Sequence, residues 1–332
     1  MNIIFDTNFL LHKNVQWLHK INRLYGDLYL ALETNVERLV ALNKWDNVFI
    51  VSDSKKKSWR QQDLDDEYKG TRTKNQDIDW KFVYETYNDF KNEIGQKYTV
   101  LERDHIEGDD WITALVYKYN KKGIGNFIVS SDQDLLQLLH FKLNKDKSYI
   151  NIQSNDKISN EKIFVPVGYE LWMDEYSKNR NSDVFNLDNS YYDLNFFQSC
   201  LNKFEIIEVD NNESLFKKLV MGDKGDNVPC PYKTLTKTGK ERGIGKAGAD
   251  KIWNHFSENY DVIFDTGSDE FTEAIVESIQ AVNKVDLSES RFNQVKNNIK
   301  SNIKLMELHY KHYPEWVLNE IIDEMNEKIF QK

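Results

Sequence analysis

The sequence predicts an α/β fold with a parallel-rich central sheet flanked by helices. Short apolar runs indicate buried strands, and apolar residues at helical spacing lie between these runs. Strands that alternate with helices form parallel βαβ units. A third observation is that acidic residues follow each run. Because ligands bind at the carboxyl ends of parallel strands, we expect these acids to gather at one edge of the sheet.

Four apolar runs supply the expected strands, over residues 2–5, 48–51, 98–101 and 127–129. A further strand is expected around residues 148–152. Helical spacing predicts helices over residues 18–42, 80–90, 111–119, 135–139, 214–221 and 290–332. The aromatic stripe within residues 80–90 is typical of a core-facing side. In the last helical region, the expected packed face consists of Trp316, Val317, Ile321 and Ile322.

Carboxylates stand at five junctions of the chain. They are Asp6, Asp53, the cluster Glu107, Asp109 and Asp110, the pair Asp132 and Asp134, and the pair Asp223 and Asp226. Like charges that crowd one edge repel each other unless cations neutralise them. Mg²⁺ takes oxygen ligands, so a set of carboxylates suits it. We therefore predict a divalent-metal site. Helix capping is the alternative for residues 107–110, and a C-cap with a turn is the alternative for residues 222–228.

Two basic segments are candidates for contact with nucleic acid. Residues 54–74 carry seven Lys and Arg residues with Trp59 and Tyr68 interleaved, which is typical either of a solvated surface or of a phosphate-contacting arm. Residues 233–251 carry six basic and two acidic residues around the glycine-rich stretch 243–249. We expect that stretch to be a hairpin between two short helices, with backbone N–H groups that grip a phosphate.

The composition bounds the class of protein. The 332 residues, of which 40% are hydrophobic, suffice for one large domain or two small ones. The net charge of −10 argues weakly against a nucleic-acid partner when it is averaged over the molecule, although basic segments can still follow phosphates. Two cysteines make no disulfide framework, and no apolar run approaches the ~18 residues of a membrane span. We therefore expect a cytoplasmic protein that is not bound to a membrane.

Taken in order, these motifs resemble the 5′-nuclease (flap endonuclease) superfamily, which has a PIN-like core. The matching pieces are residues 6–8, 52–53, 58–60, 68–72, 107–110, 130–134, 222–228 and 243–246. The sequence looks most like the ribonuclease H type of the T-even bacteriophages, a 5′→3′ exonuclease and flap endonuclease that removes RNA primers. It is not similar to the retroviral or cellular ribonuclease H fold.

The resemblance implies two Mg²⁺ ions, with Mn²⁺ as a substitute. The first ion would lie among Asp6, Asp53, Glu107, Asp109 and Asp132, and the second among Asp132, Asp134, Asp223 and Asp226. Asp110 matches a further acid of the family. These assignments make the acidic set of the chain the metal-binding part of the expected site.

The resemblance also implies contacts with the substrate. Lys69 and Arg72 would contact the scissile phosphate from a helical arch over about residues 54–97. The glycine hairpin would hold the duplex, with a bound K⁺. The residues that would bind nucleic acid are Lys13, Arg60, Tyr68, Gly243, Gly245 and Lys246. Lys13 stands where bacterial relatives carry an arginine, so bidentate phosphate contact is lost there.

Four regions are expected: a nuclease core over residues 1–165, an insertion and connection over 166–212, the second acidic pair with the glycine hairpin over 213–262, and a C-terminal helical region over 263–332. The last two regions would form the helix–hairpin–helix-type part of the fold.

We therefore predict a Mg²⁺-dependent 5′-nuclease that removes RNA primers and 5′ flaps from DNA duplexes during replication. The resemblance implies DNA and RNA–DNA hybrids as substrates, a replication clamp and a single-strand-binding protein as partners, and a monomer, in the host cytoplasm if a phage encodes it. One alternative is a PIN-type endonuclease of single-stranded RNA, which lacks the glycine hairpin. Another is a non-catalytic nucleic-acid-binding relative. A HAD-type phosphatase is disfavoured, because residues 6–8 lack the second aspartate two positions on.

Overall fold

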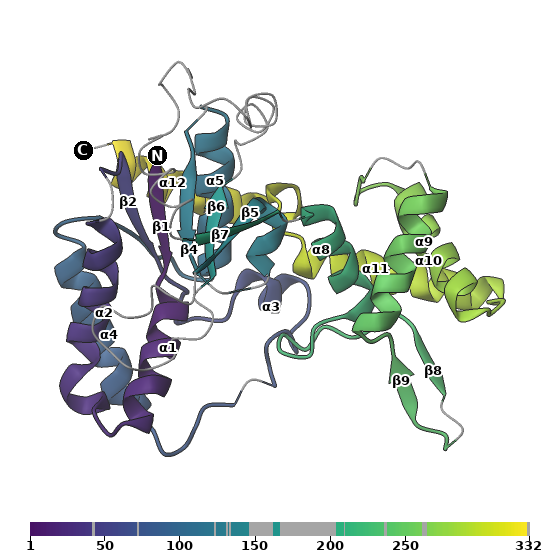
Figure 1. The fold of residues 1–332 in the computed structure, drawn as a ribbon, viewed down its shortest axis with the longest axis horizontal. Helices are drawn as coiled ribbons and strands as arrows, with labels where there is room; N and C mark the ends of the chain where they lie inside the picture. The colour runs from purple at the N-terminus through teal and green to yellow at the C-terminus, as the bar shows by residue number, and fades with distance from the viewer. Residues whose placement is uncertain are drawn as a thin grey trace. The chain divides into compact units, whose positions relative to one another are not determined.

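The chain forms two compact units (Figure 1). The structure, a computed structural model, describes residues 1–41, 44–71, 73–122, 124–130, 132, 134–145, 162–166, 204–208, 210–235, 238–260 and 264–330. Unit 1 comprises residues 1–58, 74–209 and 313–332, and unit 2 comprises residues 59–73 and 210–312.

A seven-stranded sheet in the order β3-β2-β1-β4-β6-β5-β7 forms the centre of unit 1. Its first four strands are parallel, with bounds β1 Asn2–Asp6, β2 Asn47–Val51, β3 Thr99–Leu101 and β4 Asn126–Val129. The prediction of four parallel strands is therefore confirmed. The apolar runs are buried because both faces of the sheet are covered, as parallel sheets require.

Helices pack against both faces of this sheet. Three of them share one hydrophobic cluster with β1, β2 and β4, namely α1 Thr7–Lys20, α2 Leu24–Val40 and α4 Trp80–Ile94. Helix α5 Gly108–Asn120 contacts β1, β2 and β4, and Tyr119 packs its ring 5.6 Å from that of Phe49. The helix predicted over residues 18–42 is present as α2, but it starts at Leu24, because the chain turns at residues 21–23. Leu18 belongs to a separate helix, α1, which starts directly after β1.

The remaining strands run antiparallel, with bounds β5 Leu139–Lys145, β6 Lys162–Pro166 and β7 Phe204–Glu208. The helix predicted over residues 135–139 is a short 3₁₀ helix, Asp134–Leu138. It ends where β5 begins, because pairing with distant strands sets the conformation from Leu139 onward. The strand expected at residues 148–152, and most of the predicted insertion over 166–212, lie outside the described residues.

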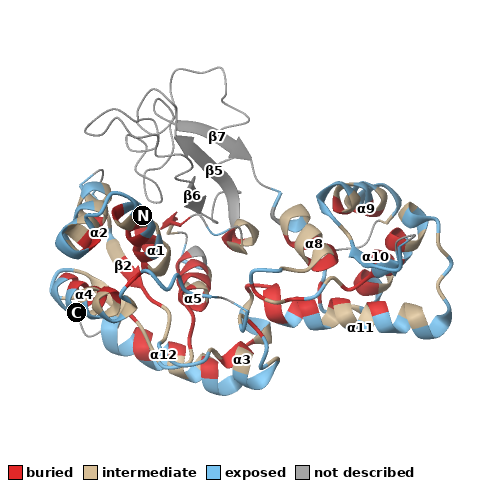
Figure 2. Cartoon of the chain, turned by 90° about the horizontal axis from the view of Figure 1, so that it is seen from below, coloured by how far each residue is buried: buried red, intermediate tan, exposed pale blue. Residues whose placement is uncertain are grey.

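The C-terminal helix α12 Glu315–Phe330 returns to unit 1 and contacts β3. Buried and exposed residues alternate along it (Figure 2). Val317 and Ile321 are buried as predicted, whereas Trp316 and Ile322 are 38% and 52% exposed. The predicted packed face was therefore half right, since only residues at the inward helical positions reach the core.

Unit 2 is mainly helical and has its own hydrophobic core. Its elements are α3 Trp59–Asp63, α8 Asn211–Met221, β8 Lys233–Leu235, β9 Glu241–Gly243, α9 Lys246–Asn259, α10 Asp269–Asn283 and α11 Glu289–Met306. The glycine turn was expected between two helices. It instead joins strand β9 to α9, because residues 241–243 pair with residues 233–235 as a short antiparallel ribbon.

The predicted arch over about residues 54–97 is divided between the units. Residues 59–73 lie in unit 2, whereas α4 packs into the core of unit 1. Among the helices that the structure describes, none combines the length and apolar character that a bilayer crossing requires.

Candidate functional site

The acids of unit 1 lie where the parallel strands end. Asp6 is the last residue of β1, and its register partner Val51 ends β2 two residues before Asp53. On the other side, Phe5 pairs with Val129, the last residue of β4, which stands three residues before Asp132. The register of adjacent strands therefore brings acids from three loops to one edge of the sheet, as predicted.

Asp6 is the most constrained of these acids. It caps α1, because its Oδ1 accepts a hydrogen bond from the backbone N–H of Phe9 at 3.0 Å. Its Oδ2 accepts a hydrogen bond from the hydroxyl of Ser130 at 2.7 Å. Burial raises the pKa of Asp6 to about 7 against the effect of both hydrogen bonds, and the charges of Asp53 and Asp132 raise it further. The negative charges of Asp53 and Asp132 are thus close enough to act on the Asp6 carboxyl.

The acids before α5 have a structural role as well. Glu107 is the N-cap, and the carboxylate of Asp110 accepts a hydrogen bond from its backbone N–H at 3.1 Å, which makes a capping box. The backbone N–H of Gly108 donates to Oδ1 of Asp53 at 2.6 Å. Helix capping is thus real for Glu107 and Asp110. Asp109, also in the first turn, is less buried than either of them.

Two hydroxyl groups that the sequence did not single out support this edge. Ser130 donates to Asp6 and accepts a hydrogen bond from the backbone N–H of Asp132 at 3.1 Å, so it links two of the loops. The hydroxyl of Tyr87 lies 2.5 Å from that of Thr7 and donates to Ser52 at 3.0 Å. Tyr87 was expected only as a core residue, because helical spacing reports burial and not the direction of a hydroxyl group.

The donor set at this edge suits a hard cation, because every candidate ligand is a carboxylate. In the described part of the chain, no three His, Cys, Asp or Glu side chains stand close enough to hold one ion directly. Mg²⁺ keeps several waters, so a looser ring of carboxylates fits a hydrated ion. The raised pKa of Asp6 fits as well, since a buried acid beside other acids needs a counter-charge to ionise.

The second acidic pair belongs to unit 2. Gly222 ends α8 with φ +71°, and the turn closes through the hydrogen-bonded pair Asp223 and Val228. Oδ1 of Asp223 accepts hydrogen bonds from two backbone N–H groups of its own turn. Despite its partial burial, the pKa of Asp223 is lowered by Lys218, whose Nζ lies 3.1 Å from Oδ2, and by those hydrogen bonds. Asp223 is therefore an ionised acid held in a fixed turn, next to the buried Asp226.

The predicted arm residues 59–69 lie in the same unit as this turn. Tyr68 is 5% exposed, and its hydroxyl donates to Oδ2 of Asp226 at 3.2 Å. Lys69 is half-buried and donates its backbone N–H to the carbonyl of Asp226 at 2.8 Å. Arg60 is buried, with its guanidinium 4.5 Å from the ring centre of Trp59. The structure thus gives Tyr68 and Arg60 internal contacts, and their contact with nucleic acid stays a prediction.

Lys13 and Arg72 were also predicted to contact the substrate. Lys13, on α1 of unit 1, is half-buried, and its ammonium lies 5.8 Å from the ring centre of Phe9. Arg72 lies outside the described residues. Their roles stay predictions.

A cavity of about 720 Å³ lies beside the glycine turn of unit 2. Gly243 and Gly245 line it, and Gly245 caps the N-terminus of α9. Arg242 also lines it and, like Lys246, is exposed and makes no ion pair with described residues. The turn thus combines free cations with the positive end of a helix, which suits a phosphate. Asp223 lines the same cavity.

Comparison with known proteins agrees with this arrangement. Residues 3–165 match the family described as 5′-3′ exonuclease, N-terminal resolvase-like domain. A 5′-3′ exonuclease of Buchnera aphidicola subsp. Schizaphis graminum is 34% identical over 167 residues, which are 48% of this chain and 55% of that protein. The match thus spans about half of each protein.

Solved structures extend the likeness of the fold to the whole chain. T5 5′-exonuclease with bound zinc has a TM-score of 0.56 at 16% identity, and 99% of each chain is covered. The bacteriophage T5 flap endonuclease in a complex with DNA and metal ions has a TM-score of 0.57 at 16% identity, with 98% of each chain covered. Residues 3–165 thus match the 5′-3′ exonuclease family, and the chain as a whole shares the fold of the T5 5′-exonuclease and flap endonuclease structures.

Proposed function

We propose that this protein is a divalent-metal-dependent 5′-nuclease, which cleaves phosphodiester bonds near the 5′ end of DNA, or of RNA annealed to DNA. Removal of RNA primers and 5′ flaps during replication, with Mg²⁺ as the cellular ion, is part of this proposal. So are a replication clamp and a single-strand-binding protein as partners. The T5 relatives bind divalent metal ions and, in one case, DNA, which supports the choice of ligand and substrate class.

The strand register that brings the buried Asp6 to the same sheet edge as Asp53 and Asp132 is the observation that carries the proposal. A purely structural carboxylate would gain from its two hydrogen bonds and ionise readily. Asp6 instead lies buried where Asp53 and Asp132 add negative charge. Such crowding costs stability unless a cation offsets it, so the edge is better suited to metal binding than to stabilising the fold.

The residues of the chain would divide the work. Asp6, Asp53, Glu107, Asp109 and Asp132 would hold a divalent ion at the sheet edge of unit 1. The acidic turn of unit 2, with Asp223 and Asp226, would contribute ligands to a second ion. When bound, such ions lower the pKa of a water molecule and stabilise the departing oxygen. Lys69 would offset charge on the phosphoryl oxygens. Gly243, Gly245 and Lys246 would hold the duplex backbone, with K⁺ as a further ion at the turn.

The test is cleavage of a 5′-labelled flap on duplex DNA, with Mg²⁺ and with EDTA, by the wild-type chain and the Asp132→Asn and Lys69→Ala variants. We expect cleavage near the junction that EDTA abolishes, and losses of about 100-fold or more in either variant. Asp46→Asn is the matched control, since Asp46 pairs with the N-terminus of the chain away from the acidic edge.

Two outcomes would reject the proposal. Faster cleavage of unpaired RNA than of the flapped duplex would indicate a PIN-type ribonuclease. Background activity that Asp132→Asn leaves unaltered would indicate a non-catalytic relative that binds nucleic acid.

A further inference from the structure

Two segments of unit 2 that are about 160 positions apart in the sequence are held together by three hydrogen bonds. The hydroxyl of Tyr68 donates to Oδ2 of Asp226 at 3.2 Å, and the backbone N–H of Lys69 donates to the carbonyl of Asp226 at 2.8 Å. The side-chain amide of Asn227 donates to the carbonyl of Glu67 at 3.1 Å. Two of the bonds are donated by residues 68 and 69 to Asp226, and the third is donated back by Asn227 to Glu67, so the two segments are fixed to each other at three points.

The backbone conformation of both segments is unusual at the contact. Lys69 has φ +57° and Asn227 has φ +60°, so two residues that are not glycine adopt left-handed conformations. For a lysine this conformation costs about 1 kcal/mol, and it persists only where the surroundings enforce it. Beside the contact, Tyr68 and Val228 pack with Leu305 and Met306 in a separate hydrophobic cluster. The cluster supplies burial that helps to hold this geometry.

The contact fixes more than the backbone of Lys69. The ammonium of Lys69 lies 5.1 Å from the ring centre of Tyr68, within the range of a cation–π interaction. The ring of Tyr68 in turn is fixed by its buried position and by the bond to Asp226. Through Tyr68, the carboxylate of Asp226 therefore influences where the Lys69 ammonium lies.

We propose that Tyr68 and Asn227 are positioning residues, which lock Lys69 to the acidic turn of residues 222–228. The turn that would bind a divalent ion thus also orients the basic side chain that would contact the phosphate. This proposal rests on the proposed function, because it assigns Lys69 a role at the scissile phosphate. Neither Tyr68 nor Asn227 needs to touch the substrate for this role.

The proposal predicts a specific kinetic pattern for Tyr68→Phe and Asn227→Gly. Phenylalanine keeps the ring and the cluster but loses the bond to Asp226, and glycine keeps the left-handed conformation but loses the bond to Glu67. We expect kcat to fall about tenfold in each variant, with KM within about twofold of the wild-type value, because small displacements of a catalytic group cost rate rather than binding. Since partial unfolding would also lower the apparent kcat without changing KM, kcat is calculated per folded molecule, with the folded fraction taken from circular dichroism.

Matched controls are available in unit 1. Tyr98 donates its hydroxyl to Glu37 at 2.9 Å, so Tyr98→Phe removes the same kind of bond. Asn22 has φ +54°, so Asn22→Gly makes the same exchange at a left-handed position. Both controls should retain wild-type kcat and KM.

A double-mutant cycle decides whether the residues act through Lys69. Tyr68→Phe should have no further effect on kcat in a Lys69→Ala background. A second measurement does not depend on activity. The Mg²⁺ concentration that gives half of the maximal thermal stabilisation should rise about threefold in Tyr68→Phe, because the Asp226 carboxylate loses the hydroxyl that orients it.

Each outcome bears on one proposal or the other. The positioning role is refuted, while the nuclease activity stands, if the wild-type chain cleaves flaps and Tyr68→Phe has the wild-type kcat. It is also refuted if Tyr68→Phe lowers kcat by the same factor in the Lys69→Ala background as in the wild-type chain. If the wild-type chain does not cleave flaps at all, the proposed function fails first. An unchanged Mg²⁺ midpoint in Tyr68→Phe would refute the coupling between the acidic turn and Lys69.

Discussion

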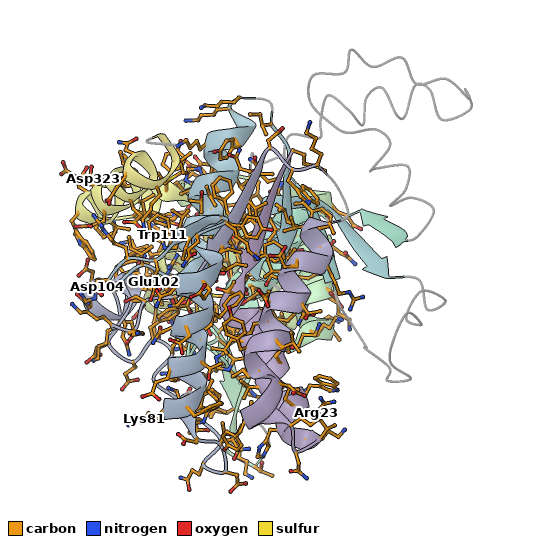
Figure 3. The ribbon with its side chains drawn as sticks, turned by 90° about the vertical axis from the view of Figure 1, so that its left-hand side faces the viewer. Arg23, Lys81, Glu102, Asp104, Trp111 and Asp323 are labelled. Carbon is orange, nitrogen blue, oxygen red and sulfur yellow. The ribbon has the colours of Figure 1, made fainter. Side chains whose placement is uncertain are left out.

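Nη1 of Arg103 lies 2.8 Å from Oε2 of Glu324, which ties the loop in front of α5 to the C-terminal helix. Nε of Arg103 makes a second bond of 2.8 Å, to Glu320. The loop that carries Glu102 and Asp104, on either side of Arg103, lies beside α12 (Figure 3). Glu102 pairs with Lys91 and Asp104 with Lys56, so three consecutive residues anchor the approach to the acidic helix.

Arg103→Ala should therefore destabilise the protein, and more so at high pH. Glu324 is 4% exposed, and burial raises its pKa while Arg103 lowers it. Without Arg103 its folded-state pKa rises further above the unfolded value, so stability is lost as the pH rises and the carboxyl must ionise. We expect the free energy of unfolding to fall by about 1–3 kcal/mol at pH 8 and by less at pH 5. The expected fall is kept small because Arg103 is partly exposed, so that solvent screens its charge.

Urea unfolding of both proteins at the two pH values measures this difference. Lys97→Ala, which removes the exposed pair with Glu37, should leave stability nearly unchanged. A loss for Arg103→Ala that is equal at pH 5 and pH 8 would contradict the assignment to Glu324.

The ion-free protein should lose stability as the pH rises through the range of Asp6. The pKa of Asp6 in the folded protein, about 7, lies above the ordinary aspartate value of 3.8, so the native state binds more protons than the unfolded state between these pH values. The effect of this carboxyl is at most about 4 kcal/mol between pH 4 and 7. Urea unfolding in EDTA should show a decline that Asp6→Asn reduces. Mg²⁺ should oppose the decline in the wild-type protein only, and an equal response of the variant would contradict this account.

Substitutions of Asp53 should separate its two roles. Asp53→Asn keeps an oxygen that accepts from the N–H of Gly108, whereas Asp53→Ala loses it and leaves that donor without this partner. Both variants should bind Mg²⁺ more weakly, but only the alanine variant should lose about 1–2 kcal/mol of stability. Calorimetric Mg²⁺ titration and urea unfolding measure the two effects. Equal stability of the two variants would show that the bond to Gly108 does not matter.

Gly222→Ala should disrupt the second acidic turn. Gly222 has φ +71°, and an added Cβ would stand 2.6 Å from the carbonyl oxygen of Val228 and from the backbone of the next residues. We expect a loss of more than about 2 kcal/mol. Gly245→Ala is the control, because Gly245 has open space where the Cβ would be added. Circular dichroism during thermal unfolding checks both, and a stable Gly222→Ala variant would contradict the strained turn.

Lys246→Ala should weaken duplex binding in a way that depends on salt. If Lys246 neutralises one phosphate, its loss lowers the slope of log affinity against log salt by about one. Lys20→Ala on α1 removes an exposed lysine of unit 1 as a control. Fluorescence anisotropy with a labelled duplex at several salt concentrations measures the slope, and an unchanged slope would remove Lys246 from the interface.

Much of unit 1 could be predicted because its signals are local. The apolar runs before Asp6 and Asp53 predicted two strands, and their parallel pairing places Asp6 and Asp53 at the same edge of the sheet. The capping box of Glu107 and Asp110 was also within reach, since its partners stand three residues apart. Helix α1 was missed although Leu10, Leu11, Val15 and Leu18 carry its pattern.

Other features depend on partners far away in the sequence. Strand β5 was not predicted, because its pairing with β6 and β7 leaves no local mark in the sequence. The bond between Tyr68 and Asp226 joins residues 158 positions apart, so an exposed aromatic on a basic arm was the natural expectation for Tyr68. Ser130 lies within the matching stretch 130–134, but its hydroxyl can donate to Asp6 only because β4 lies beside β1 in the sheet.

Unit 1 is assembled from three separate stretches of chain, and the last of them is α12. During synthesis the strands of the sheet emerge from the ribosome long before α12 has been made. Domains otherwise fold as they emerge, N-terminal parts first. Until then, Arg103 lacks its partners Glu320 and Glu324, and the loop ahead of α5 has no anchor on that side. Until α12 has been made, a nascent chain would therefore carry every acid of the sheet edge without the support that Glu320 and Glu324 give to the loop ahead of α5.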